Sequence, residues 1–450
     1  MMGPEIIIFV TLGLLIAMIL WGIHLISALM FVSVVGIFLA TGNFNVAMNV
    51  LANTAWGAIR DHIFGVIPLF TLLGLFANLS GASHDLYDAA SLILKKVRGG
   101  IGMATVIANA IFGAITGVSV ASAAVFTKIA YPQMVKRGYD KKIASGAIAG
   151  SAMLGMLIPP SLLMIVYGIQ ADVSIGRLFM AGVIPGIIMS IIFCITIVII
   201  GKIRPAAIPP ADNLTAEERK NFWKVMLKTW PIALLIFVTL GGIYLGWFTP
   251  TEAAGVGAFG ALVMVFAKGQ FSPKTLWNTL LEAGSTTGSV LFLLIAAQTY
   301  SRCLAISGVI NLIEGFVMGL NIPIMGIIII FMLILVFLGC MLDSTSILLL
   351  TMPFMAPVMR NLGVDMVWFG IVAIVSIQTG LVTPPFGMNV FTVRIAAQGI
   401  PGVEPLSVED IFAGSIPFLL GIFLLVIIML IFPPMVTYLP NLMIASYAGG

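Results

Sequence analysis

Two segments of the chain combine paired prolines with glycines and polar side chains, a pattern suited to binding ions. One is Gly155–Ser161, which reads GMLIPPS, and the other is Thr379–Asn389, which reads TGLVTPPFGMN. Proline has no amide hydrogen and clashes with the preceding helical turn, so two in a row interrupt a helix. The carbonyl and amide groups freed at such a break can bind cations and anions, respectively.

A second pair of polar interruptions, rich in glycine and hydroxyl groups, precedes the proline breaks. They lie at Thr116–Ser122 and Gly339–Ser346, within the apolar segments 101–135 and 325–359. We predict that each segment is a re-entrant helical hairpin, with two very short spans as the alternative for the first. Na⁺ is a hard cation and needs several oxygen ligands. The predicted ligands are carbonyl and hydroxyl oxygens of Gly117, Ser119 and Gly155 in the first half, and of Gly339, Ser344, Thr345, Gly380 and Thr383 in the second.

Asp343 lies within the second hairpin tip, at a membrane depth where charged side chains are rare and are functional candidates by default. We expect its carboxylate to take part in an ion site or in gating, with capping of the following helix as the alternative. Arg302 is expected to pair with Glu314 near the outer surface, with binding of an anionic substrate as the alternative. Lys128 is expected to extend toward the cytoplasmic surface.

The composition indicates that these segments are held in a lipid bilayer. Of the 450 residues, 60% are hydrophobic and only 8% are charged, whereas soluble domains carry roughly 25% charged residues. Several apolar stretches approach the length of about 20 residues that a helical span needs. The chain is therefore predicted to be an all-α polytopic membrane protein. Its net charge of +4 does not indicate a nucleic-acid partner.

The positions of the basic residues predict the orientation of the spans. Most of the 21 lysines and arginines fall on one side if the spans alternate, and the side richer in these residues faces the cytoplasm. Both termini are then expected on the opposite, periplasmic side. Residues 53–61 are expected to form a connector on that side.

The second half of the chain repeats the first in inverted orientation. A constant shift of 225 residues aligns the two halves, matching Ser119 with Ser344, Gly155 with Gly380, Pro159 with Pro384 and Pro160 with Pro385. Inverted repeats with discontinuous helices are a recurring plan of secondary transporters. The first repeat is predicted to span residues 1–200, with hairpin 101–135 and broken helix 141–170, and a cytoplasmic linker (201–228) follows it. The second repeat is predicted to span residues 229–434, with hairpin 325–359 and broken helix 367–393, and to be followed by a periplasmic tail (435–450). In the linker, Thr215 and Glu218 predict a capping box for a helix on the membrane surface or in solvent.

The distribution of reactive side chains argues against several other functions. The three cysteines, Cys194, Cys303 and Cys340, lie in apolar segments without a CxxC or Cys/His cluster, so no disulfide and no metal other than sodium is predicted. A primary pump would need a GxxxxGK[ST] loop, an enzyme would need clustered catalytic groups, and a channel would need a continuous polar ring. None of these is evident, and no organic cofactor is expected.

The motifs resemble those of the large membrane subunit of tripartite ATP-independent periplasmic (TRAP) transporters over nearly the whole chain. The resemblance rests on Gly65–Gly81 (GVIPLFTLLGLFANLSG), Phe112–Ser122 (FGAITGVSVAS), Pro132–Asp140 (PQMVKRGYD), Leu154–Tyr167 (LGMLIPPSLLMIVY), Ser174–Gly186 (SIGRLFMAGVIPG) and Thr379–Asn389. It implies an elevator-type, sodium-coupled importer of small organic anions in the bacterial inner membrane. It also implies two partners: a small membrane subunit, expected as a separate chain, and a periplasmic substrate-binding protein.

In the family that the chain resembles, hairpin tips and broken helices form the ion and substrate sites. By that resemblance Pro159 joins the predicted sodium site, and the predicted substrate-binding residues are Ser122, Pro160, Ser161, Ser346, Pro384, Pro385 and Asn389. Val118 stands where the family often has a second serine. This weakens the prediction of a side-chain ligand at that position but not that of a backbone ligand. A proton-coupled carrier of the same fold is the alternative, although the chain has few buried titratable groups to serve it.

Overall fold

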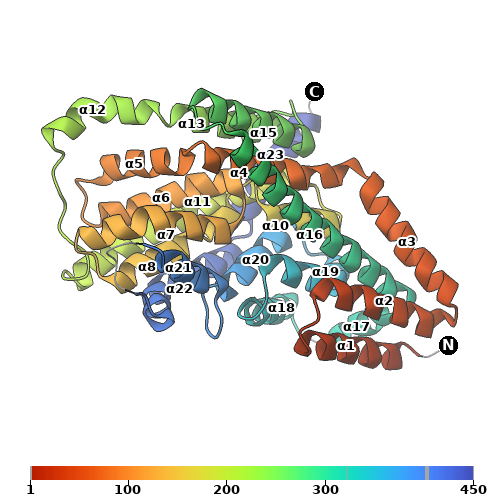
Figure 1. Ribbon diagram of the computed structural model, residues 1–450. Coiled ribbons are helices and arrows are strands. Elements are labelled where there is room, and N and C mark those ends of the chain that lie inside the picture. The colour runs from red at the N-terminus through yellow and green to blue at the C-terminus, as the bar shows by residue number, and fades with distance from the viewer. Residues whose placement is uncertain (1–2, 321, 401–404, 449–450) are drawn as a thin grey trace.

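The computed structural model describes residues 3–320, 322–400 and 405–448, with only the backbone described for residues 444–448. Every regular element in these ranges is helical (Figure 1). The first half contains α1 (Pro4–Leu20), α2 (Leu25–Thr41), α3 (Phe44–Arg60), a 3-10 turn (His62–Gly65), α4 (Val66–Leu79), α5 (Ala82–Leu94), α6 (Gly100–Thr116), α7 (Ser119–Lys136), α8 (Lys141–Ser151), α9 (Leu154–Leu157), α10 (Leu162–Ala171) and α11 (Ile175–Ile203). The linker and second half contain α12 (Ala216–Leu227), α13 (Trp230–Ile236), a π-helical turn (Phe237–Gly241), α14 (Gly242–Tyr244), α15 (Pro250–Ala267), α16 (Pro273–Ile306), α17 (Val309–Gly319), α18 (Ile324–Gly339), α19 (Ser344–Asn361), α20 (Met366–Gly380), α21 (Met388–Ala397), α22 (Val408–Ile431) and α23 (Pro434–Ala448).

The helices differ in whether they are long enough to cross a membrane. In the described ranges six helices are long and apolar enough to cross a membrane, or seven if the bent α8–α10 segment is one span. The first helix of each predicted hairpin is shorter, with 17 residues in α6 and 16 in α18. At 1.5 Å per residue, 16 residues cover about 24 Å, less than the roughly 30 Å of hydrocarbon. The chain is thus a multi-pass membrane protein, and α6 and α18 are shorter than a straight helical span.

Both predicted hairpins and both predicted broken helices are present. Helices α6 and α7 form the first hairpin, and α18 and α19 form the second. The first broken helix, α8 to α10, bends by 42° at its break, and the second consists of α20 and α21. A long helix follows each of them, α11 in the first repeat and α22 in the second, and these two helices pack against each other.

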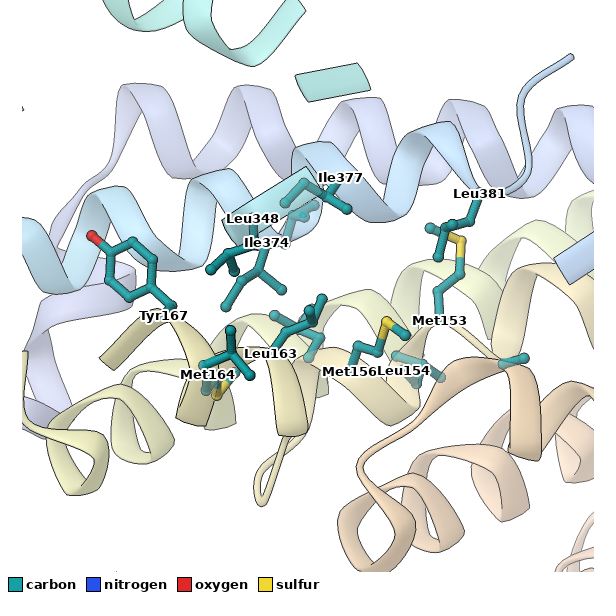
Figure 2. Close-up of a cluster of buried hydrophobic side chains, with 14 of the residues drawn as sticks. Met153, Leu154, Met156, Leu163, Met164, Tyr167, Leu348, Ile374, Ile377 and Leu381 are labelled. Carbon is teal, nitrogen blue, oxygen red and sulfur yellow. The ribbon is translucent and has the colours of Figure 1, made fainter. Parts of the chain in front are cut away.

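The two repeats interlock. Helix α7 of the first hairpin packs against α21 of the second broken helix, and α19 of the second hairpin packs against α10 of the first. Figure 2 shows the apolar core between the repeats, where Leu163 and Tyr167 of α10 lie near Leu348 of α19 and Ile374 of α20. Because lipid tails are as apolar as leucine, close packing rather than transfer out of water holds such helices together.

Three features differ from the sequence-based expectations. Residues 53–60 are not a connector but belong to α3, which Asn43 caps by accepting a hydrogen bond from the amide of Asn45 at 2.9 Å. The predicted tail is the helix α23, which packs on α11 and α20, although residues 449–450 lie outside the described residues. Within those residues Arg302 is exposed and forms no ion pair with Glu314.

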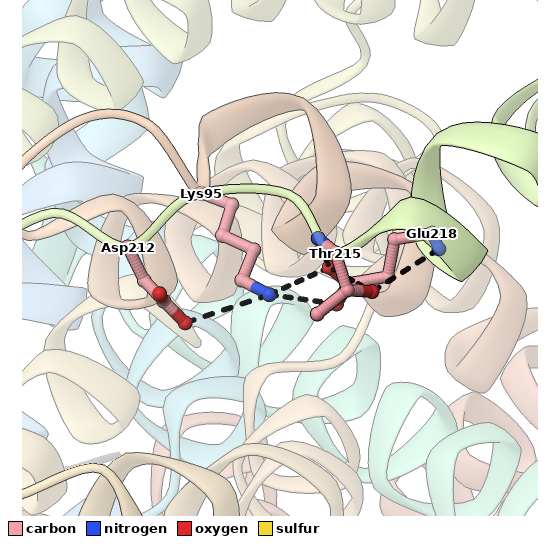
Figure 3. Close-up of polar contacts among 4 residues, drawn as sticks. All are labelled: Lys95, Asp212, Thr215 and Glu218. Atoms are coloured by element: carbon pink, nitrogen blue, oxygen red, sulfur yellow. Dashed lines mark hydrogen bonds and ion pairs between the residues drawn. The ribbon is translucent and has the colours of Figure 1, made fainter.

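The linker is anchored to the turn that leads into the first hairpin (Figure 3). The Lys95 side chain is only 6% exposed, and its Nζ lies 2.7 and 2.8 Å from the two carboxylate oxygens of Glu218 and 3.5 Å from the carboxylate of Asp212. Glu218 also completes the predicted capping box by accepting a hydrogen bond from the amide of Thr215 at 2.7 Å. The bond from Lys95, followed by that from the Thr215 amide, lowers the pKa of Glu218 below its ordinary value.

Replacing Glu218 with glutamine is expected to lower stability near neutral pH, with a smaller loss in acid. The pKa of Glu218 is lower in the folded protein than its ordinary 4.5, so its stabilisation is full above that pH and is lost as pH falls through the folded-state value. Because the pair is partly exposed and Lys95 keeps Asp212, the loss should be about 1 kcal/mol. Thermal unfolding over a pH series measures it, with the exposed neighbour Glu217→Gln as control. A gap in Tm that does not change with pH would contradict this assignment.

Candidate ion and substrate site

The first hairpin tip rests on the first proline break. Helix α6 ends at Thr116 and α7 begins at Ser119, so Gly117 makes the turn with a left-handed φ of +65°. The Gly117 carbonyl accepts a hydrogen bond from the amide of Leu162 at 3.3 Å. A Cβ at Gly117 would lie 2.7 Å from the carbonyl oxygen of Pro160. Glycine is therefore required here both by the backbone conformation and by the close approach of a second backbone.

A pair of facing glycines brings each hairpin against its own broken helix. In the first repeat, a Cβ on Gly113 would lie 2.4 Å from the Cα of Gly155. In the second repeat, a Cβ on Gly380 would lie 2.4 Å from the Cα of Gly339. Small residues allow membrane helices to approach this closely. The repeats therefore correspond in three dimensions as well as in sequence.

The second hairpin tip is closed by Asp343 and touches the first broken helix. Asp343 caps α19 by accepting a hydrogen bond from the amide of Ser346 at 3.0 Å, so the capping role weighed for this carboxylate is present, while its ion role stays a prediction. The buried Ser344 hydroxyl donates to the sulfur of Met156 at 3.7 Å. A thioether is a weak acceptor, so this contact leaves the lone pairs of the Ser344 oxygen available to a cation.

Polar contacts also cross between the repeats at the breaks. The Ser119 hydroxyl donates to Oδ1 of Asn389 at 3.2 Å, and both side chains are fully buried. Within the described residues, neither Nδ2 of Asn389 nor the buried hydroxyl of Ser122 has a hydrogen-bond partner. Leaving such a group unpaired costs about 1–3 kcal/mol. The unpaired atoms therefore favour the binding of an ion or a polar molecule beside Ser122 and Asn389.

The remaining predicted residues divide by exposure. The buried ones are Pro159, Pro160, Ser161 and Ser346, and the partly or fully exposed ones are Thr345, Thr383, Pro384 and Pro385. Two of the hydroxyls bond to nearby backbone: Ser161 donates to the Met156 carbonyl at 2.6 Å, and Thr383 to the Thr379 carbonyl at 2.7 Å. Backbone carbonyls at the breaks are therefore better placed than these two hydroxyls to serve as cation ligands.

Gln378 is a buried polar residue near the breaks that was not predicted from the sequence. Gln378 lies on α20, half a turn before Gly380, and is fully buried. Neither its amide oxygen nor its amide nitrogen has a partner among the described residues. The available signal was a lone amide side chain at the end of an otherwise apolar helix, a rare choice at membrane depth.

A cavity of about 150 Å³ separates the first hairpin tip from helices α4 and α16. Its lining includes Gly117, Val118 and Pro160 on one side, and Glu282 and Thr286 of α16 on the other. The described residues contain no group of three or more His, Cys, Asp or Glu side chains that could hold a metal. Most ligands of an ion at the breaks would therefore be carbonyl and hydroxyl oxygens, with Asp343 as the predicted carboxylate, and such oxygen ligands suit a hard cation such as Na⁺.

Two inverted repeats that meet at two interrupted helices, with unpaired polar groups at membrane depth, define the architecture of a secondary transporter. The chain belongs to the family described as "Tripartite ATP-independent periplasmic transporter, DctM component", which matches residues 12–435. The resemblance drawn from the sequence motifs is thereby confirmed.

Named relatives agree with this assignment. The chain is 32% identical over 383 residues to the C4-dicarboxylate TRAP transporter large permease protein DctM of Pseudomonas aeruginosa, with 84% of each chain covered. It is 30% identical over 383 residues to the sialic acid TRAP transporter permease protein SiaT of Haemophilus influenzae, covering 84% of this chain and 60% of that protein. Both relatives are named as transporter permeases, which confirms a transporter subunit rather than an enzyme.

A solved structure supports the fold independently of close sequence similarity. The YdaH transporter of Alcanivorax borkumensis superposes with a TM-score of 0.58 at 13% identity, covering 87% of this chain and 89% of that chain. At this identity the likeness speaks for the fold alone. It confirms the predicted all-α membrane-transporter architecture.

Proposed function

We propose that this chain is the sodium-coupled membrane subunit that carries a small organic anion into the cell. The proposal rests on one observation, the contact of each hairpin with its proline break through facing glycines. Each contact brings a turn whose oxygens keep a lone pair for a cation, at Gly117 or Ser344, close to a break that starts near Gly155 or Gly380. One Na⁺ bound at each contact would favour the binding of an anion beside it. The binding of Na⁺ and the binding of the anion would then strengthen each other reciprocally.

The substrate is proposed to bind between the two breaks, where Ser119 of one repeat meets Asn389 of the other. The two named relatives transport C4-dicarboxylates and sialic acid by their names, and these compounds share a carboxylate group. A small carboxylate is therefore the proposed substrate class. The tripartite and periplasmic terms of the family description support two partners, a small membrane subunit and a periplasmic binding protein that delivers the substrate.

Transport is proposed to follow an elevator mechanism in the bacterial inner membrane. The hairpins and broken helices pack against each other across the repeats, α7 on α21 and α19 on α10, which suits movement as a unit. Helix α16 packs against α2, α3 and α4, and these helices are the proposed frame. The basic residues of the linker support a cytoplasmic position for the linker and a periplasmic position for both termini.

The first test is the thermal stability of the purified protein, with its small subunit if needed, in a Na⁺ titration balanced by K⁺ or choline. A ligand that binds only the folded state raises its stability, so a saturable and Na⁺-specific rise in Tm is expected. Ser344→Ala should weaken the affinity for Na⁺ by about tenfold. It should leave the Tm without Na⁺ nearly unchanged, because only the weak contact with Met156 is lost.

The matched control is Ser376→Ala on α20, whose hydroxyl donates to the carbonyl of Val372 in its own helix at 2.8 Å. This variant should respond to Na⁺ as the wild type does. A flat response of the wild type would contradict sodium coupling and make uptake driven by a pH gradient the next measurement. Wild-type Na⁺ affinity in Ser344→Ala would exclude that hydroxyl as a ligand.

A further inference from the structure

Four buried polar side chains near the breaks have polar atoms without a hydrogen-bond partner among the described residues. They are Asn109, Ser122, Gln378 and Asn389, and all four are fully buried. Native proteins leave few buried polar groups unpaired, and each such group needs an explanation. These atoms are therefore candidates for contact with a molecule other than the chain itself.

Each of the four side chains breaks the symmetry between the repeats. Their counterparts in the other repeat are all apolar and fully buried: Leu335 for Asn109, Ile347 for Ser122, Met153 for Gln378 and Met164 for Asn389. The first pair is aligned on the facing glycines and the other three on the constant shift of 225 residues. Figure 2 shows the two methionine counterparts within the packed apolar core. By contrast, Ser119, Gly155, Pro159 and Pro160 of the first repeat recur at the same shift as Ser344, Gly380, Pro384 and Pro385, although Leu342 stands at the position of Gly117.

Three of the four residues lie on helices that hydrogen bonds connect across the boundary between the repeats. Ser122 lies one turn beyond Ser119, whose hydroxyl bonds to Asn389. The backbone amide of Asn389 donates to the Leu381 carbonyl at 3.2 Å, and Gln378 lies one turn before Leu381 on α20. Ser122, Asn389 and Gln378 therefore lie on three helices, α7, α21 and α20, that these hydrogen bonds connect, and the three residues are called the polar strip below.

We propose that this strip recognises the organic substrate and that Gln378 is a binding residue within it. The inference rests on the function proposed above. Two identical ions can occupy symmetry-related contacts, so their ligands can be the same in both repeats. A single organic anion that lies across the boundary meets each repeat with a different part of the molecule. Its ligands must therefore differ between the repeats.

The side chains of the strip specify the chemistry of the substrate. The amide N–H groups of Gln378 and Asn389 donate to carboxylate oxygens, whereas Oε1 of Gln378 can only accept a hydrogen bond. A substrate that satisfies both kinds of group carries a carboxylate together with a hydroxyl or N–H group. Among C4-dicarboxylates, malate meets this requirement, and succinate, which lacks the hydroxyl, does not.

The test replaces Gln378 with methionine, the residue of nearly equal volume at the equivalent position of the other repeat. The Tm of the purified wild type and variant is measured in Na⁺ alone and then in titrations with malate and succinate. Without substrate, Gln378→Met should be at least as stable as the wild type, because an unpaired amide is removed, and it should keep its Na⁺ response. Its affinity for malate should fall about tenfold, to that for succinate, because the partner of the hydroxyl is gone.

The matched control is Gln170→Met on α10, which also removes an amide oxygen without a partner but lies away from the breaks. It should retain the malate response of the wild type. A lower substrate-free Tm in Gln378→Met, or loss of its Na⁺ response, would overturn the proposal, because the amide would then serve the folded framework or the ion site.

The remaining outcomes separate this proposal from sodium coupling. Unchanged malate affinity in Gln378→Met overturns the role of this residue in recognition. If the wild type does not respond to Na⁺, sodium coupling fails, and the malate comparison still decides the role of Gln378. If neither acid raises the Tm of the wild type, the Tm of Gln378→Met without substrate is compared with that of the wild type. A higher Tm in the variant would support the proposal, and a lower one would overturn it.

Discussion

Replacing Gly414 with alanine is expected to prevent stable folding. Gly414 lies on α22 against α8, and a Cβ there would be 1.8 Å from the carbonyl oxygen of Lys142. The reverse contact is similarly tight, because a Cβ on Gly146 would lie 2.1 Å from the carbonyl carbon of Gly414. The obstructing atoms are all backbone atoms, so no side chain can rotate away. The two helices would have to separate.

The expected cost of Gly414→Ala lies at or above the upper end of the usual range for overpacking, about 1–3 kcal/mol. Such a loss is a large share of a total stability of about 5–15 kcal/mol. Size-exclusion chromatography after detergent extraction, together with Tm, measures the effect. Gly57→Ala on α3 is the control, because no atom lies within 4 Å of its Cβ position. A monodisperse Gly414→Ala protein with the Tm of the wild type would show that the α8–α22 contact tolerates separation.

The outline of the site was predictable from sequence because helix breakers act locally. The Pro159-Pro160 pair ends a helix whatever surrounds it, and the constant shift of 225 residues located the equivalent break in the second repeat. The linker capping box was predictable for the same reason, since the spacing of Thr215 and Glu218 alone defines it. Local rules therefore located the hairpin tips, the breaks and the repeat.

Contacts between the repeats were beyond such rules. Ser119 and Asn389 are 270 residues apart, and only the interlocked packing of α7 on α21 brings them together. Gln378 resembles any residue at the end of an apolar helix until its burial and missing partners are known. For Asp343, the sequence allowed both an ion ligand and a helix cap, and the hydrogen bond from the Ser346 amide identified the cap.

Gly380→Ala is expected to abolish Na⁺-dependent uptake, even in protein that folds. A Cβ on Gly380 would lie 2.4 Å from the Cα and carbonyl carbon of Gly339, and 2.6 Å from the carbonyl oxygen of Val336. The second hairpin would have to move by about 1 Å to restore ordinary contacts, and its carbonyl groups would move with it. Misplacement by that distance can cost on the order of a hundredfold in a preorganised site. Uptake of labelled dicarboxylates and sialic acid into proteoliposomes that hold the small subunit, with the binding protein added outside and a Na⁺ gradient applied, measures the loss.

Gly155→Ala makes the same change at the symmetry-related position, where the geometry is less severe. The nearest atoms to a Cβ there, the Cα of Gly113 and the Oγ of Ser122, lie at 3.3 Å, so a shift of a few tenths of an ångström would accommodate it. We expect this variant to keep part of its uptake while Gly380→Ala loses it. Equal uptake in the two variants would contradict a difference between the two contacts. Full uptake in Gly380→Ala would remove the facing glycines from the transport mechanism, because that hairpin could then shift without disturbing the bound ion.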